Sequence, residues 1–154
     1  MRFYILFAAW TLLAGAGIPL IGVLNSVVAR GVGNPLAATA IMFTIAMVVA
    51  FGVTLPVYGP PSAAQLTTVP LVSYGAGLLI GFYALSATII IPQFGAASFV
   101  AFILVAQLFT SAFIDQFGLF GMAKRPIDMT RLIGLTVIVA GIAIMEIGNL
   151  RNAR

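Results

Sequence analysis

The sequence contains no cysteine and no histidine. Without cysteine the chain can form no disulfide bond, thiolate nucleophile or cysteine-ligated metal site. Without histidine it lacks the commonest general base and metal ligand of proteins. Glycine-rich phosphate loops and paired nucleophile motifs are missing too. The sequence therefore gives no sign of an enzyme, and we expect neither a metal nor a cofactor.

Charged residues are also scarce, with seven Lys or Arg and three Asp or Glu among 154 residues. None of them lies between Arg30 and Asp115. A soluble domain is normally about a quarter charged, so lipid is the natural solvent for this stretch. The basic residues that give the net charge of +4 are not interleaved with aromatic residues, so we expect no nucleic-acid partner.

Apolar residues are abundant and make up 62% of the chain. A helix that crosses a bilayer needs roughly 20 predominantly apolar residues. Because lipid-embedded backbone groups must be satisfied within their own segment, each such stretch is expected to be helical. The sequence predicts an all-α integral membrane protein, with residues 1–154 as a single transmembrane domain. Its five predicted helices are 3–28, 36–55, 69–91, 96–117 and 129–148.

Short turns with recognisable capping residues separate these helices. Pro35 is suited to the first position of a helix and follows a turn that contains Gly33. Ser62 and Gln65 have the spacing of a capping box, which predicts a short helical turn between the second and third long helices. Asp128 precedes the last predicted helix and is expected to be its N-cap.

Lys and Arg residues are divided almost equally between the two sides of the membrane, because five crossings place the termini on opposite sides. Positive charges normally favour the cytoplasmic side, but a difference of one charge does not decide an orientation. Either the N-terminus has a weak cytoplasmic preference, or copies insert both ways and pair antiparallel. The two groups are Arg2, Lys124, Arg125 and Arg131 on the N-terminal side, and Arg30, Arg151 and Arg154 on the other.

Glycines recur at helical spacings that favour close helix packing. Gly134, Gly141 and Gly148 are seven residues apart, so they share one face of the last predicted helix. Small residues on one face allow membrane helices to approach closely, either within one subunit or between two. For the last helix we expect a dimer seam. Two further pairs are Gly15 with Gly22 and Gly77 with Gly81.

Polar side chains within the apolar windows are candidates for function, because burying them in hydrocarbon is costly. Gln107 lies at the middle of the fourth predicted helix, and Ser111 and Asp115 follow at four-residue steps on the same face. They either fasten a neighbouring helix or line a substrate path. Asn25 lies about 7 Å inside the end of the first predicted helix. Since Pro19 precedes it, Asn25 either belongs to a small polar site beside a helix break or packs against another helix.

Two acidic residues and one aromatic residue complete the candidates. Asp115 opposes the helix dipole near the end of its helix, so it should have a basic partner on its side of the membrane. That pair is either structural or a protonatable gate. Glu146 is near the opposite rim and is expected to pair with Arg30 or Arg151, or to connect two subunits. Tyr83 lies deep in the third predicted helix and either lines a cavity or packs.

Three stretches of the chain resemble a known family of membrane proteins. They are Pro19 through Asn25 to Arg30, Gly81-Phe82-Tyr83 through Pro92 and Gly95, and Gln107 through Ser111 to Asp115. Together with the seven-spaced glycines, they resemble the drug/metabolite transporter superfamily, and most closely its YdcZ-like five-helix branch of inner-membrane exporters. The small multidrug resistance family is a more distant resemblance, and there the glycine-bearing last helix forms an antiparallel dimer seam.

The resemblance implies that this chain is half of a ten-helix bundle in a bacterial inner membrane. It would work as an antiparallel homodimer or with a paired homologous subunit, and would export a small neutral or amphipathic molecule by alternating access. The glutamate that the small multidrug resistance family uses in its first helix has no counterpart here, so that proton-coupled mechanism does not carry over. A lipid-translocating or lipid-binding subunit, and a non-transporting partner subunit, remain alternatives.

We therefore expect three groups of functional residues. Gln107, Asn25, Tyr83 and Ser111 are the candidates for binding substrate. Asp115 and Glu146 are the candidates for coupling or gating, and Gly134, Gly141 and Gly148 for the dimer seam.

Overall fold

A computed structural model describes the backbone of residues 2–152 and the side chains of residues 3–151. Arg154 and the side chain of Arg2, which enter the charge count above, lie outside the described residues. Every element within the described range is helical, and five helices are long and apolar enough to span a membrane. The predicted all-α membrane fold with five spanning helices is therefore confirmed. The chain divides into two compact units, Met1–Ala96 and Ala97–Arg154.

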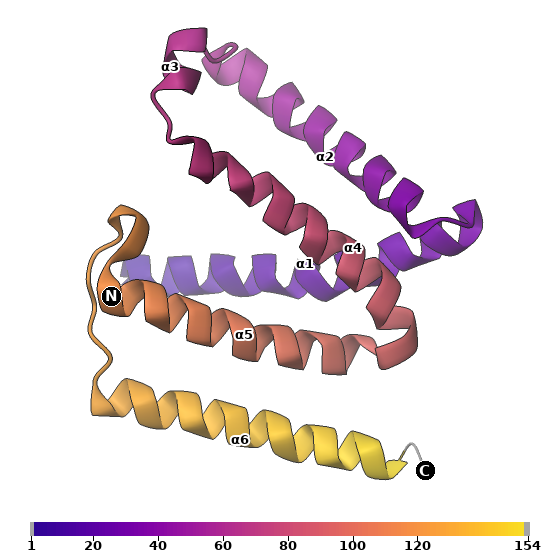
Figure 1. Ribbon diagram of the computed structural model, residues 1–154, viewed down its shortest axis with the longest axis vertical. Helices are drawn as coiled ribbons and strands as arrows, with labels where there is room; N and C mark the ends of the chain where they lie inside the picture. The colour runs from indigo at the N-terminus through magenta and orange to yellow at the C-terminus, as the bar shows by residue number, and fades with distance from the viewer. Residues whose placement is uncertain (1, 153–154) are drawn as a thin grey trace. The chain divides into compact units, whose positions relative to one another are not determined.

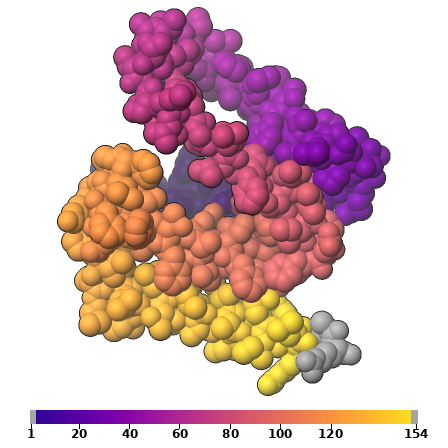
Figure 2. All heavy atoms as spheres, in the orientation of Figure 1, coloured from indigo at the N-terminus to yellow at the C-terminus, as the bar shows by residue number. Residues whose placement is uncertain are grey.

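The first unit contains three of the long helices. They are α1 (Arg2–Val32), α2 (Pro35–Tyr58) and α4 (Ala76–Phe94), with the short α3 (Ala63–Thr67) and the 3₁₀ turn η1 (Leu71–Gly75) between the last two. Figure 1 shows α2 and α4 diverging towards α3, and in Figure 2 side chains leave an opening between the diverging ends. The packing of this unit is therefore concentrated where α1, α2 and α4 meet.

The turn between α1 and α2 forms as its residues predict. Gly33 has a φ of 75°, a left-handed conformation that a residue with a side chain rarely adopts. Asn34 is the N-cap of α2, and its side-chain oxygen accepts a hydrogen bond of 2.9 Å from the Leu36 backbone N–H. The predicted capping box of Ser62 and Gln65 is also present. These caps satisfy backbone donors at helix ends near the membrane surface.

Small residues form the contact between α1 and α4. A Cβ atom added to Gly22 would lie 2.3 Å from Ile91 Cδ1 and 3.2 Å from Ala87 Cβ. Ala87 and Ile91 are buried on the facing side of α4. The absence of a side chain at Gly22 therefore allows α1 and α4 to approach closely, as small residues do in membrane bundles.

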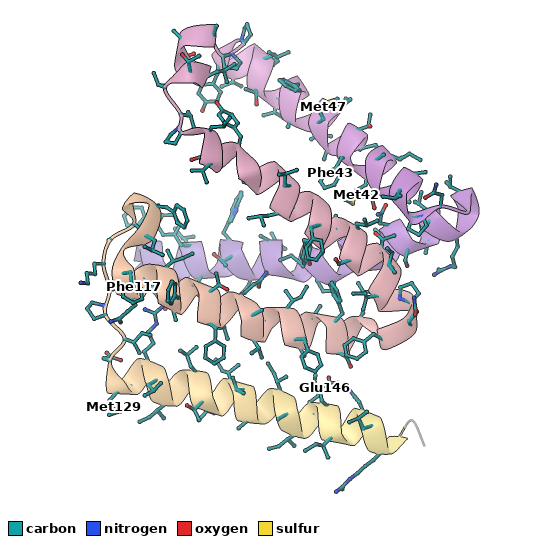
Figure 3. All side chains as sticks on the ribbon, in the orientation of Figure 1. Met42, Phe43, Met47, Phe117, Met129 and Glu146 are labelled. Carbon is teal, nitrogen blue, oxygen red and sulfur yellow. The ribbon has the colours of Figure 1, made fainter. Side chains whose placement is uncertain are left out.

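The second unit contains α5 (Ala96–Phe117), the short η2 (Leu119–Gly121) and α6 (Met129–Asn152). Figure 3 labels Phe117 and Met129, which end α5 and begin α6 at the same end of this unit. The connection is held by the Arg125 backbone N–H, which donates to the Asp115 carbonyl at 2.8 Å. Asp128 accepts a hydrogen bond of 2.7 Å from the Arg131 backbone N–H, which confirms it as the predicted N-cap of α6.

Large apolar side chains are exposed along all the long helices. Trp10 is 77% exposed, Phe82 75% and Ile144 71%. Exposure of this kind on a water-soluble monomer would be an aggregation hazard, but hydrocarbon is an equivalent solvent for these side chains. The outer surface therefore agrees with a membrane location.

Candidate functional site: a buried polar cluster between three helices

Asn25 joins the three long helices of the first unit. Its side-chain Nδ2 donates a hydrogen bond of 2.7 Å to Thr88 Oγ1 on α4 and one of 3.3 Å to Thr39 Oγ1 on α2. The exposed fractions of Asn25, Thr39 and Thr88 are 5%, 7% and 2%. We call these three residues the polar cluster. It is a buried polar connection made entirely of uncharged side chains.

The orientation of the Asn25 amide follows from the two threonines. The Thr39 hydroxyl donates to the Pro35 carbonyl at 2.9 Å, and the Thr88 hydroxyl donates to the Ala84 carbonyl at 2.8 Å. Each hydroxyl has one proton, so its oxygen is left as an acceptor towards Asn25. The amide NH₂ must therefore face the threonines. Asn25 Oδ1 accepts none of the hydrogen bonds found among the described residues and is left available.

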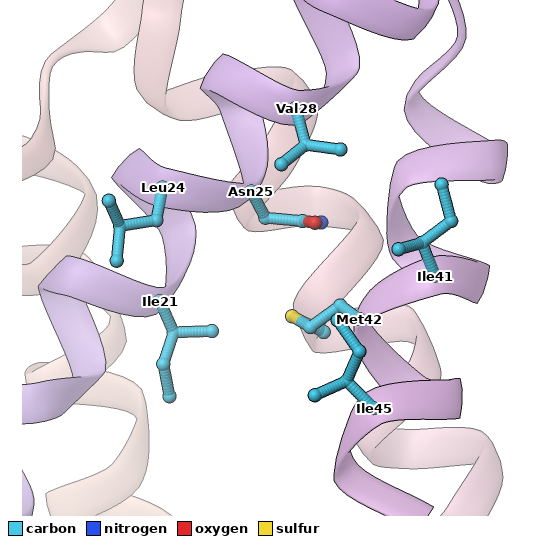
Figure 4. Close-up of a pocket in the computed structure, with 7 residues that line it drawn as sticks. All are labelled: Ile21, Leu24, Asn25, Val28, Ile41, Met42 and Ile45. Carbon is cyan, nitrogen blue, oxygen red and sulfur yellow. The ribbon is translucent and has the colours of Figure 1, made fainter.

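Two hollows flank the polar cluster. The first, the α1–α2 groove, has a volume of about 250 Å³ and is lined by Ile21, Leu24, Asn25, Val28, Ile41, Met42 and Ile45. Figure 4 shows the Asn25 amide projecting from α1 into this groove, between Val28 and Met42. The second, the rim recess, has a volume of about 360 Å³ and includes Thr88, Arg30 and Gln93 in its lining. The cluster therefore contributes Asn25 to one hollow and Thr88 to the other.

Pro92 adds a further polar atom beside the cluster. Proline has no N–H, so Pro92 cannot donate to the Thr88 carbonyl one turn earlier in α4. Pro19 in α1 releases the Gly15 carbonyl in the same way, but Gly15 is about 15 Å along the helix from Asn25. The released carbonyl closest in sequence to the cluster thus comes from α4, whereas the helix break predicted beside Asn25 was at Pro19 in α1.

The other predicted substrate residues have less buried positions. Gln107 and Ser111 lie on exposed parts of α5 in the second unit, and the Ser111 hydroxyl donates to the Leu108 carbonyl at 3.1 Å. Tyr83 is half-buried on α4, four residues before the buried Ala87. Asn25 and Tyr83 belong to the first unit and Gln107 and Ser111 to the second, and their roles in binding stay predictions.

Asp115 has the basic partner that its position predicts. Its Oδ2 accepts a hydrogen bond of 2.6 Å from Arg131 Nη2, and both side chains are about one-third exposed. The pair connects the end of α5 to the first turn of α6. An ion pair of this exposure contributes about 0–1 kcal/mol, so its removal should leave the helices folded.

Glu146 has a polar neighbour on its own helix. Its Oε1 accepts a hydrogen bond of 3.2 Å from Asn149 Nδ2, which also donates to Ser98 Oγ on α5 at 3.3 Å. Figure 3 places Glu146 on the side of α6 that faces α5. Among the described residues of the second unit, the ion pair that forms is Asp115 with Arg131, and Arg151 does not pair with Glu146.

The seven-spaced glycines of α6 lie on the side of the helix away from α5. Cβ atoms added to Gly134, Gly141 and Gly148 would meet no described atom within 4 Å outside their own helix. The opposite face of α6, with Leu135 and Val139, lines a groove of about 300 Å³ that Phe109 of α5 completes. At 3.6 residues per turn, the glycine face is about 170° around the helix from this groove. Within the described part of the second unit, α5 therefore leaves the glycine face of α6 uncovered.

Sequence reasoning identified Asn25 but missed Thr39 and Thr88. Threonine in a membrane helix commonly bonds its own backbone, as both of these do, so neither carries a distinctive sequence signal. They lie 14 and 63 residues from Asn25 along the chain. The acceptors could be identified only after the three helices had been brought together.

The described residues do not supply a metal site, since no three acidic, histidine or cysteine side chains among them lie close enough together. Five helices that are long and apolar enough to span a bilayer, three of them connected by a neutral polar cluster, define a multi-helix integral membrane protein. The chain belongs to the family described as "Putative inner membrane exporter, YdcZ", whose profile matches residues 6–144. This is a family of inner-membrane exporters and not of enzymes. No curated protein and no solved structure matches the chain.

Proposed function

We propose that two copies of this chain form a secondary transporter that exports a small neutral or amphipathic molecule by alternating access. The observation that carries the proposal is the polar cluster, which is uncharged and lies between the α1–α2 groove and the rim recess. The uncharged, mostly apolar lining of the groove suits a neutral or amphipathic substrate better than a small ion, whose lost hydration it could not replace. The cluster also connects three helices, so its opening would change the access from either hollow.

The coupling residue is proposed to be Asp115, with Glu146 as a second candidate. Asp115 is about one-third exposed and paired with Arg131, and this pair connects the end of α5 to the start of α6. A step that breaks the pair would release the connection between the two helices. Gln107 and Ser111 lie on exposed surface of α5, where a second subunit or a substrate can reach them.

Flux from proteoliposomes tests the transport proposal. We expect at least one solute from a panel of radiolabelled neutral and amphipathic compounds to leave several times faster than from empty liposomes. Asn25→Leu should remove most of this gain, because leucine keeps the branched shape of the side chain and lacks the amide that binds both threonines. Thr11→Ala, which removes an exposed hydroxyl bonded to its own helix, is the control for protein handling and reconstitution.

A folded, dimeric protein that accelerates none of the panel would contradict the transport proposal. A non-transporting partner subunit would then be the better description. Acceleration of a labelled phospholipid alone would instead identify a lipid-translocating subunit.

The coupling proposal predicts a separate effect of Asp115. If Asp115 is the coupling residue, Asp115→Asn should abolish the pH dependence of the flux, while the folded fraction is unchanged because the ion pair contributes only about 0–1 kcal/mol. The measurement is the initial flux rate at several pH values. The double change Asp115→Arg with Arg131→Asp is the control, since it restores the pair and moves the carboxylate. An unchanged pH profile in Asp115→Asn would show that the pair is structural.

A further inference from the structure

We propose that the α1–α2 groove binds an uncharged amphiphile whose head group donates a hydrogen bond to Asn25 Oδ1 and whose unbranched aliphatic tail lies along the groove. This inference rests on the proposed function, because it gives the chemical class of the molecule that the transporter binds. It is argued from the lining of the groove, the direction of the Asn25 amide and the absence of charge.

At the polar end of the groove, the ligand must supply a hydrogen-bond donor. Both threonine hydroxyl protons are used by carbonyls of their own helices, so the Asn25 NH₂ is held against the threonine oxygens. The remaining polar atom of Asn25 is an amide oxygen, which accepts hydrogen bonds and cannot donate them. Every fully buried polar side-chain atom among the described residues has a partner, so the unpaired Oδ1 is not fully buried. Asn25 lines the groove, and Figure 4 shows its amide projecting into it. A ligand with an O–H or N–H group would satisfy this oxygen, whereas an ether or ester would not.

The rest of the groove requires a narrow aliphatic group. Apart from Asn25, its lining consists of six aliphatic or methionine side chains and no aromatic ring. Ring-stacking ligands and flat cations would find no aromatic face there. The volume of about 250 Å³ is near the lower end for small-molecule sites, which favours a slender chain. Met42 adds a flexible thioether that can adapt to different tail lengths.

No charged side chain lines the groove, and this excludes ionised head groups. An ammonium or carboxylate placed beside Asn25 would lose its hydration without gaining a counter-ion. Arg30 lines the rim recess and not this groove. The head group is therefore an uncharged donor such as a primary alcohol.

A matched pair of small amphiphiles tests the inference by binding alone. 1-Decanol and methyl nonyl ether have the same molecular formula, but only the alcohol can donate a hydrogen bond. The full chain in lipid nanodiscs is labelled with a ten-carbon primary alcohol that carries a diazirine on its tail, and labelled residues are located by mass spectrometry. We expect labelling within 21–28 of α1 and 41–45 of α2, which 1-decanol displaces at a roughly three- to tenfold lower concentration than the ether.

Two variants assign this difference to the groove. Asn25→Leu should make the alcohol and the ether compete equally, because the acceptor is gone. Ile45→Trp should fill the groove and reduce its labelling severalfold without touching the polar cluster. Met47→Trp is the matched control, since Met47 is exposed on roughly the opposite face of the same helix and should leave the labelling unchanged. The Ile45 and Met47 pair keeps the test decisive even if Asn25→Leu does not fold.

Equal competition by the alcohol and the ether would overturn the inference and would indicate that a lipid tail occupies the groove. Labelling confined to other helices would also overturn it. Neither result bears on flux, so the proposed transport could still hold with a different ligand. Conversely, preference for the alcohol without any accelerated flux would support the ligand class and contradict the transport proposal.

Discussion

Gly22→Leu should destabilise the first unit by about 1–3 kcal/mol, the usual range for inserting side-chain volume into a packed contact. The reason is the close approach of α1 and α4, where even a Cβ atom at Gly22 would lie 2.3 Å from Ile91 Cδ1. Gly15→Leu is the matched control on the same helix, because a Cβ there meets no described atom within 4 Å. The free energy of unfolding can be measured by titrating the purified protein with SDS and following its helicity.

A double change tests whether Ile91 Cδ1 is the atom that clashes with a side chain at position 22. Gly22→Ala should be moderately destabilising, because the Ile91 side chain must move and Ala87 Cβ lies at 3.2 Å. Ile91→Val removes the Cδ1 atom and should recover part of the loss, so the two changes should be non-additive. If Gly22→Leu and Gly15→Leu have equal stabilities, the α1–α4 contact described above is wrong.

Cysteine pairs on α6 should reveal an antiparallel dimer through a specific pattern of disulfides. In the proposed seam, Gly141 is the midpoint between Gly134 and Gly148, so it meets its own copy in the partner. Gly134 of one chain then meets Gly148 of the other, and the two copies of Gly134 lie about 21 Å apart. Since the chain has no native cysteine, every disulfide that forms must join two introduced cysteines.

The expected result follows from the distance limits of a disulfide, whose Cα atoms lie about 4.4–6.8 Å apart. Gly141→Cys should cross-link by itself, and Gly134→Cys should cross-link when mixed with Gly148→Cys but not alone. Cross-linking of Gly134→Cys with itself would instead show a parallel dimer. The measurement is the fraction of dimer on a denaturing gel after mild oxidation of native membranes.

A bulky residue in the seam should then weaken the dimer. Gly141→Leu is expected to raise the dissociation constant by roughly tenfold or more, about 1.4 kcal/mol, because the helices can no longer approach closely. Ala140→Leu is the control, because Ala140 lines the groove towards α5. Equal dimer fractions in the two variants would contradict the seam, and transport should fall in parallel with the dimer.

Much of this protein's architecture can be read from local sequence. Long apolar windows predicted five spanning helices, since hydrocarbon allows few backbone conformations other than a helix. Capping residues predicted several turns correctly, because a cap acts over three or four residues: Ser62 with Gln65, and Asp128 with the Arg131 backbone. A basic partner for Asp115 was predicted from its position at a helix end, and the structure identifies that partner as Arg131. Helix ends were less accurate, and α1 continues to Val32 because Gly31 does not interrupt it.

Local sequence is enough to predict the lipid environment, the number of spanning helices and the caps, because each depends on residues close together in the chain. Which small and polar residues act together depends instead on how the helices pack. Gly15 and Gly22 have the same spacing pattern, yet only Gly22 lies against α4. No hydrogen-bond partner for Asn25 was predicted from the sequence, and the fold places Thr39 and Thr88 beside it. Contacts between distant helices depend on how complete helical surfaces fit together, and hydropathy does not record that fit.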